Sequence, residues 1–370
     1  MSARPATRRA PVASPSDAPL RPAVRDFTGG AAGHVIEWDV RPVYDFLFSL
    51  TGEAGATDDL PTEDRRWVES ARAALTKHER ALYDQMAATE VAIHLAAFVV
   101  EHRSLDTTDA VVEAFEAAGP IPLLRSVFSE ATASNPAIAP VLERAFAGDT
   151  SAIGELEASL PAWHRKERLA LLADPEATHR DIVELTRAWA NSFRPIEGRI
   201  KDILARDFDL RAGDRTTLTG PDLIERTTGG VRWLPEPGIR RVVLAPSYFS
   251  RPFNFLLAGP DWRFFGYPVA DNALEVSDPL APPQQVLRLH RALGDATRLR
   301  ILKLLAERDL YLTEIAQQLE LSKPTIKHHL AQLRAAGLLT VVEAGAVVYY
   351  SLRRARLDDA TVDLKRFLLG

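Results

Sequence analysis

Polar side chains cluster at the start of one amphipathic segment near the C-terminal end of the chain. Between Lys323 and Ala336, apolar residues recur at three- and four-residue spacing, which predicts a helix with one buried face. Hydroxyl, amide and imidazole groups at the start of such a helix can reach base edges in the major groove of duplex DNA. The candidates for base contact are Ser322, Lys323, Thr325, Lys327, His328 and Gln332.

Basic side chains flank this segment and could neutralise DNA phosphates. Lys323 and Arg334 belong to the segment itself, and Arg298 lies near the start of an earlier predicted helix. Arg353 and Arg354 follow a predicted hairpin. These residues are the candidates for phosphate contact.

The charge distribution agrees with a nucleic-acid contact at one end of the chain. Residues 284–370 hold 14 Lys and Arg against 9 Asp and Glu, an excess of +5. Residues 1–283 hold the remaining 31 against 41, a deficit of −10. A basic C-terminal module on an acidic body favours attraction of a polyanion to that module.

The elements that must position these side chains follow a recognisable order. Residues 286–307 predict two helices separated at Gly294-Asp295, and residues 312–319 predict a third. The segment from Lys323 comes next and is ended by Gly337, and residues 339–352 then predict a β-hairpin. This order is that of a winged helix-turn-helix, with residues 323–336 as the recognition helix. A winged helix that only binds protein is the alternative.

These C-terminal residues resemble the ArsR family of winged-helix transcriptional regulators over about a fifth of the chain. The matching segments are Leu293–Leu302 (LGDATRLRIL), Leu312–Ala316 (LTEIA), Ser322–Leu330 (SKPTIKHHL), Arg334–Leu339 (RAAGLL) and Val348–Tyr350 (VYY). The resemblance implies a homodimer that binds an inverted-repeat operator in double-stranded DNA, with a ligand altering affinity. It also implies that residues 284–293 and 357–369 form the dimer interface.

One departure concerns metal sensing. The metal-sensing branch of the family carries cysteines where this chain has Tyr311 and Thr313, and the chain contains no cysteine. An arsenite-type thiolate site is therefore excluded.

The adjacent His328 and His329 point about 100° apart on a helix, so they are not expected to chelate one ion. His329 is expected to pack inward. No cofactor or metal is expected.

Other residues in the N-terminal body could do chemistry, and each has an ordinary structural interpretation. Glu90 and His94 are one helical turn apart, with Glu101 and His102 further along, but the zinc-protease spacing is missing. His164 is expected to be a surface residue of a basic patch. The chain has no nucleophile elbow, P-loop or dinucleotide-binding glycine pattern. An aromatic set is expected to be core, with a pocket wall or dimer surface as the alternative: Trp233, Tyr248, Phe249, Phe253, Phe255, Trp262, Phe264, Phe265 and Tyr267.

The body is predicted to be mainly helical with a small β element. A strand is expected near His34, helices over 42–50, 61–82, 106–118, 161–173 and 176–193, and a further helix opened by Pro195. Strands are expected at 241–244 and 262–267.

The predicted domains are a disordered tail (1–33), a regulatory or assembly domain (34–276), a linker (277–283), the winged helix (284–355) and a dimerisation helix (356–370).

Composition indicates the cellular compartment and the kind of organism in which the protein is found. No run of 18 apolar residues is present, so no membrane span is expected, and the N-terminal residues lack the apolar stretch of a secretory signal. The absence of cysteine fits the reducing cytoplasm. Only 7 of the 45 basic residues are lysine, which with abundant alanine favours a GC-rich bacterial source.

The sequence therefore predicts a cytoplasmic DNA-binding regulator that is not an enzyme. The body would modulate DNA binding by holding a small-molecule effector or by fixing the dimer. The alternative is an enzyme or protein-interaction domain fused to a DNA-binding winged helix. Operator, effector and direction of regulation are left open by the sequence.

Overall fold

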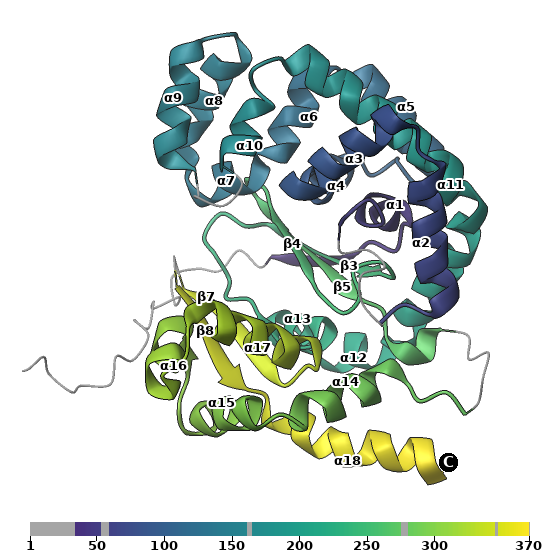
Figure 1. Cartoon of the computed structure of the whole chain (residues 1–370), viewed down its shortest axis with the longest axis vertical. Helices are drawn as coiled ribbons and strands as arrows, with labels where there is room; N and C mark the ends of the chain where they lie inside the picture. The colour runs from purple at the N-terminus through teal and green to yellow at the C-terminus, as the bar shows by residue number, and fades with distance from the viewer. Residues whose placement is uncertain (1–33, 53–58, 161–164, 275–279, 345–346, 370) are drawn as a thin grey trace, which may run out of the picture. The chain divides into compact units, whose positions relative to one another are not determined.

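The computed structural model describes residues 34–52, 59–160, 165–274, 280–344 and 347–369. The expected tail, His164 and the first part of the expected linker lie outside these described residues. The described chain is mainly helical and contains two small sheets, as the sequence predicts (Figure 1). Among the described helices, none combines the length and hydropathy that a membrane span requires.

Helices make up most of the N-terminal body. Two short 3₁₀ segments accompany them, Pro136–Ile138 and Asp271–Ala273. The helices are α1 (Val43–Phe48), α2 (Thr62–Ala74), α3 (Lys77–Thr89), α4 (Val91–Glu101), α5 (Thr108–Ala118), α6 (Pro120–Val127), α7 (Ser129–Ser134), α8 (Ala139–Phe146), α9 (Thr150–Ser159), α10 (Arg165–Ala170), α11 (Pro175–Leu210), α12 (Ala212–Thr217) and α13 (Gly220–Thr228).

The helix expected over residues 61–82 is in fact two helices, α2 and α3. Thr76 separates them because its hydroxyl accepts a hydrogen bond from the backbone N–H of Glu79 at 3.2 Å. The Glu79 carboxylate in turn accepts from the backbone N–H of Thr76 at 2.7 Å. This reciprocal capping box begins a new helix and overrides the continuous apolar spacing.

At Pro195 the sequence predicts a new helix, but the structure has one continuous helix, α11, through this residue. Proline disrupts a helix by removing one N–H and crowding a preceding carbonyl. Here Pro195 is exposed, so solvent can satisfy a freed carbonyl. The indole N–H of Trp67 also donates to the neighbouring carbonyl of Ser192 at 3.3 Å.

A four-stranded sheet in the order β1-β3-β5-β4 divides the body into two cores. Its strands are β1 (Val35–Trp38), β3 (Arg241–Ser247), β4 (Phe255–Ala258) and β5 (Trp262–Pro268), and only β4 is antiparallel to its neighbour. Side chains alternate between faces, so Val243 and Phe264 join the large helical core whereas Val242 and Phe265 join a smaller one. Figure 1 shows α4 and α11 on one side of this sheet and α13 on the other.

The aromatic set around this sheet is core, as expected. Eight of its nine members are buried, and Phe253, which is partly exposed, is the exception. These side chains therefore stabilise the body by burial of apolar area.

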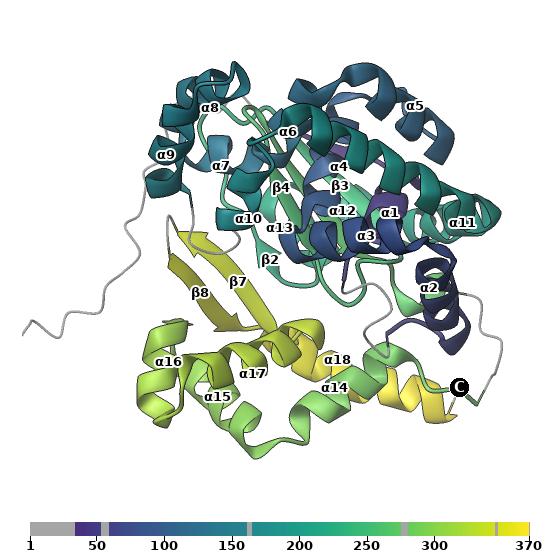
Figure 2. The same ribbon diagram turned by 45° about the horizontal axis from the view of Figure 1, so that its top comes forward.

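The C-terminal region has the predicted winged helix-turn-helix order. Its elements are α14 (Gln284–Leu293), α15 (Ala296–Glu307), β6 (Leu310–Tyr311), α16 (Leu312–Leu319), α17 (Lys323–Ala335), β7 (Leu339–Ala344), β8 (Val347–Leu352) and α18 (Arg354–Leu369). A separate apolar core holds them together, with Ile315, Ile326 and Leu333 fully buried. Figure 2 shows the β7–β8 hairpin beside α15, α16 and α17.

The body contributes an additional strand to the winged-helix sheet. Strand β2 (Val231–Arg232) pairs in parallel with β7, giving the sheet order β2-β7-β8-β6. The backbone N–H of Val341 donates to the carbonyl of Gly230 at 2.7 Å. The hairpin is therefore joined to the body by backbone hydrogen bonds as well as by the covalent chain.

Candidate nucleic-acid interface

The start of α17 is fixed by local capping. Ser322 has extended backbone dihedrals, and its hydroxyl accepts from the backbone N–H of Thr325 at 3.3 Å. Pro324 lies in the first turn, where helices tolerate proline because no intrahelical N–H is needed. Gly337 follows the helix with a φ of +70°, a conformation that favours glycine.

One face of α17 is buried and the other is exposed. Ile326, Leu330 and Leu333 pack into the winged-helix core. The exposed side chains are the predicted candidates, brought together on one helix: Ser322, Lys323, Thr325, Lys327, His328, Gln332 and Arg334. This arrangement presents two lysines, one arginine and several neutral hydrogen-bonding groups to solvent on one element.

The two adjacent histidines have different environments. His328 is exposed, whereas the His329 side chain is only 15% exposed, with its Nδ1 lying 3.8 Å from Asp295 Oδ1. Asp295 also caps α15 by accepting from the backbone N–H of Arg298 at 2.9 Å. His329 therefore packs toward α15, in agreement with the sequence interpretation.

The other predicted arginines make contacts within the winged helix. Arg298 donates to the carbonyls of Ala292 and Arg291 at 2.9 and 2.6 Å, so it closes the C-terminal end of α14. Arg354 donates to the carbonyl of Ala306 at 2.5 Å. These bonds fix both guanidinium groups at helix ends, where cations are favoured.

Arg353 departs further from the expectation of a phosphate contact at the edge of the hairpin. It is partly buried and lines a cleft formed jointly by the body and the winged helix. Its guanidinium lies close to Gly229 and Gly337, the residues that follow α13 and α17. In this arrangement Arg353 faces the body.

Sequence reasoning missed the residues by which the body holds the hairpin. Glu225 of α13 accepts a hydrogen bond from the Thr340 hydroxyl at 3.0 Å and forms an ion pair with Arg232 at 3.0 Å. The available signal was the Gly229-Gly230 pair together with the residues that follow it. Val231 and Trp233, separated by one arginine, follow this pair and are compatible with a short strand.

The candidate metal ligands of the body do not converge. Glu90 lies between α3 and α4, and His102 ends α4, where its ring stacks on Phe98. His94 is buried and hydrogen-bonds to Arg168, with Glu130 3.8 Å away. Within the described ranges, no three His, Asp or Glu side chains form a group suited to a metal ion.

Two titratable groups with shifted pKa values are packed into the body. Burial raises the pKa of Asp45 to about 6, although its carboxylate accepts hydrogen bonds from Ser247, Tyr248 and Phe249. Burial and the Arg168 cation lower the pKa of His94 to about 3. Both groups are fully enclosed and form part of the packed structure of the body.

Comparison with known proteins identifies the C-terminal region. A family model described as bacterial regulatory protein, arsR family, matches residues 295–341. The HTH-type transcriptional regulator KmtR of Mycobacterium tuberculosis is 34% identical over 88 residues, covering 23% of this chain and 68% of that protein. The transcriptional repressor SdpR of Bacillus subtilis is 39% identical over 70 residues, covering 19% of this chain and 78% of that protein.

Among solved structures, HlyU from Vibrio cholerae is similar at 29% identity, covering 24% of this chain and 95% of that chain with a TM-score of 0.20. The segment matched by the family model contains the whole of α17 and leaves the body outside the match. The relatives that this chain covers over more than two thirds of their length are transcriptional regulators. The chain therefore belongs to the ArsR family of bacterial regulatory proteins.

Proposed function

We propose that the protein is a transcriptional regulator that binds an inverted-repeat operator as a homodimer, with α17 in the major groove. The exposed polar face of α17 on a buried apolar underside is the observation that carries this proposal. Thr325 and Gln332 would contact base edges, whereas Lys323, Lys327 and Arg334 would contact phosphates. Such a regulator acts in the bacterial cytoplasm, where the chromosome lies.

Apolar exposure on α18 supports the homodimer. Leu357, Val362 and Leu368 are 37%, 52% and 64% exposed on this single helix. Exposed aliphatic side chains gathered on one helix are unfavourable in water and favour a protein partner. With a second copy of the chain on α18, two recognition helices would read half-sites about 10 base pairs apart.

The body is proposed to set the DNA affinity of the winged helix. Its strand β2 and Glu225 both contact β7, the strand that directly follows α17 and Gly337. A shift of α13 would therefore be transmitted to the hairpin and to the recognition helix. Regulation of this kind requires two states with different DNA affinity, typically separated by about 1–3 kcal/mol.

Selection of DNA from a random pool by the full-length protein tests the proposal. We expect an inverted repeat to be enriched, and the purified complex to contain two chains per duplex. Recovery of no sequence motif, together with no retarded band in a gel shift at low salt, would refute DNA recognition by this chain. Enrichment of a single half-site bound by one chain would refute only the homodimer.

A further inference from the structure

The body and the winged helix enclose a large cleft that the proposed DNA contact does not use. Its volume is about 1440 Å³, more than the roughly 300–1,000 Å³ of common small-molecule sites. Apolar side chains from both parts line it, including Val269 and Leu274 of the body and Leu287 and Phe367 of the winged helix. The cleft therefore has space and apolar surface for an organic molecule.

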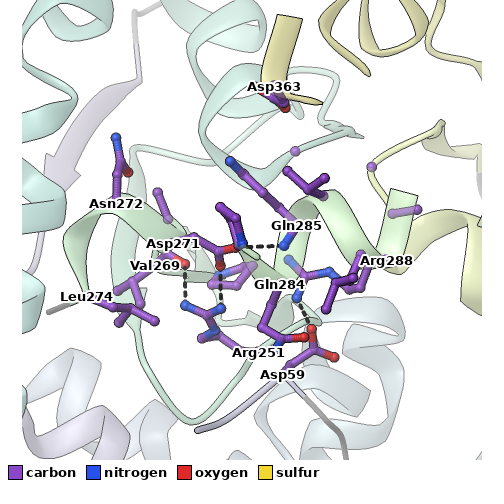
Figure 3. Close-up of a pocket in the computed structure, with 18 of the residues that line it drawn as sticks. Asp59, Arg251, Val269, Asp271, Asn272, Leu274, Gln284, Gln285, Arg288 and Asp363 are labelled. Atoms are coloured by element: carbon purple, nitrogen blue, oxygen red, sulfur yellow. Dashed lines mark hydrogen bonds and ion pairs between the residues drawn. The ribbon is translucent and has the colours of Figure 1, made fainter. Parts of the chain in front are cut away.

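Ionic contacts form one wall of this cleft (Figure 3). Arg288 of α14 pairs with Asp59 of the body, and both side chains are largely buried. Asp271 pairs with Arg251 and accepts from the backbone N–H of Gln285 at 2.6 Å, at the N-terminal end of α14. These contacts show that charged groups already join the body to the winged helix at this wall.

A second group of cationic side chains lines the cleft where α13, α17 and α18 meet. Arg226 pairs with Asp214 at 3.6 Å, and Arg356 pairs with Asp363 at 2.7 Å. Among the described residues, the Arg353 side chain forms no hydrogen bond or ion pair, although it is partly buried. The C-terminal ends of α13 and α17 supply partial negative charge near it, but that stabilisation is smaller than an ion pair.

Cationic side chains in this part of the cleft lie close enough to repel one another. Burial and the neighbouring Arg226 cation lower the pKa of Arg353, and Arg356 acts in the same direction, whereas the carboxylates of Glu225 and Asp359 act in the opposite direction. Burial and Arg356 also lower the pKa of Arg288 to about 10. Partial burial of the Arg353 cation without an ion-pair partner is unfavourable, and a bound anion would relieve it.

We propose that this cleft binds an organic anion, with its carboxylate or phosphate against Arg353 and its apolar part against the aliphatic and aromatic lining. The proposal rests on the proposed regulatory function, because it identifies where an effector would act. Arg226 belongs to the body, whereas Arg353 and Arg356 belong to the winged helix. An anion held between them would favour one arrangement of α13 relative to the hairpin and so alter DNA affinity.

Fluorescence titration of the full-length protein with 1-anilinonaphthalene-8-sulfonate, an aromatic anion, tests the site. We expect saturable binding at one site per chain, weakened about tenfold or more in Arg353→Gln, since a charge-assisted hydrogen bond is lost. Arg353→Lys, which keeps the cation, should retain most of the affinity. Arg125→Gln is the matched control, because Arg125 is 55% exposed, is paired with Glu143, and is not among the residues that line the cleft.

Competition then identifies the chemistry of the anion. Displacement of the probe by octanoate assigns a carboxylate ligand, and displacement by inorganic pyrophosphate assigns a phosphate ligand. Displacement by neither, or equal affinity in wild type and Arg353→Gln, would overturn the proposal. Should Arg353→Gln fail to fold, Arg226→Gln decides the outcome, because the Arg226 side chain is 53% exposed.

Binding of selected DNA without added anion is measured separately. Failure to bind DNA would refute the proposed function without contradicting the anion site.

Discussion

Gly230 of the body and Leu339 of the winged helix lie in such close contact that no side chain fits between them. A Cβ atom on Gly230 would lie 2.3 Å from the carbonyl oxygen of Leu339. Gly230 also has a φ of +132°, which residues with a side chain rarely adopt. Glycine at position 230 therefore allows the body to add its strand β2 to the hairpin without strain.

Replacing Gly230 with alanine is expected to destabilise this junction by about 1–3 kcal/mol, because the new methyl group meets backbone atoms that cannot rotate away. Gly238→Ala is the control, since Gly238 also has a positive φ, +86°, but has open space around its Cβ position. Urea unfolding followed by circular dichroism measures both. Equal losses of stability in the two variants would show that the contact with Leu339 is unimportant.

The sequence was sufficient to predict the winged helix because its information is local. The spacing of Ile326, Leu330 and Leu333, the cap at Ser322 and the stop at Gly337 all act within a few residues. The pairing of β2 with β7 joins segments more than a hundred residues apart, and no periodicity in either segment encodes it. The orientation of Arg353 toward the body was missed for the same reason.

Boundaries in the body failed where two local rules competed. The apolar spacing predicted one helix across Thr76, where a capping box separates two helices, and Pro195 predicted a helix start inside the continuous helix α11. At Thr76 the local capping box prevails, whereas at Pro195 the helix continues and is contacted by a distant residue. Trp67 illustrates this, because it contacts the α11 backbone beside the proline from 125 positions away.

Thr325 is expected to contribute to sequence recognition by the exposed face of α17. Thr325→Ala should weaken binding to the selected operator by about 1–3 kcal/mol while leaving binding to random DNA nearly unchanged. Thr325→Ser keeps the hydroxyl, which also bonds to Ser322 at 2.7 Å, and should retain most of the preference. Competition binding against mutated half-sites measures this. Equal weakening on both DNAs would assign Thr325 a structural or phosphate role instead.

DNA binding is expected to be insensitive to arsenite and cadmium at micromolar concentrations. Soft ions bind through thiolates, and this chain has no cysteine. Tyr311 and Thr313 occupy the positions where the metal-sensing branch of the family carries cysteines. Fluorescence anisotropy of the operator complex during ion titration checks this. Release from DNA accompanied by stoichiometric ion binding to the purified protein would contradict it.

His94 is expected to make the body less stable in acid. Its pKa is about 3 in the folded protein and higher when unfolded, so the unfolded chain takes up a proton first as pH falls. The stabilisation is present above the unfolded pKa and is lost toward pH 3, at no more than about 1.4 kcal/mol per pH unit. His94→Gln should flatten the dependence of unfolding free energy on pH between about pH 6 and about pH 4. An unchanged slope would mean that His94 titrates normally.

Asp45 is expected to act in the opposite direction. Its pKa is about 6 in the folded protein and lower when unfolded, so its contribution to stability is present at low pH and is lost as pH rises through 6. Asp45→Asn is expected to lose stability at every pH, because an amide cannot accept all three of the hydrogen bonds made to the carboxylate. The diagnostic quantity is therefore the slope: the difference from wild type should shrink between about pH 4 and about pH 7. A constant difference would refute the shift.

The salt dependence of DNA binding tests the central claim, that α17 is the element that binds duplex DNA. Fluorescence anisotropy would compare wild type, Lys327→Ala and Lys201→Ala on the selected operator across a salt series. Lys327 is exposed on α17, whereas Lys201, the control, is exposed on α11 of the body. Removing one phosphate contact lowers the slope of log affinity against log salt by about 1 for each protomer. The account predicts this reduction, with weaker binding at every salt concentration, for Lys327→Ala and an unchanged line for Lys201→Ala. Superimposable lines for wild type and Lys327→Ala would contradict it.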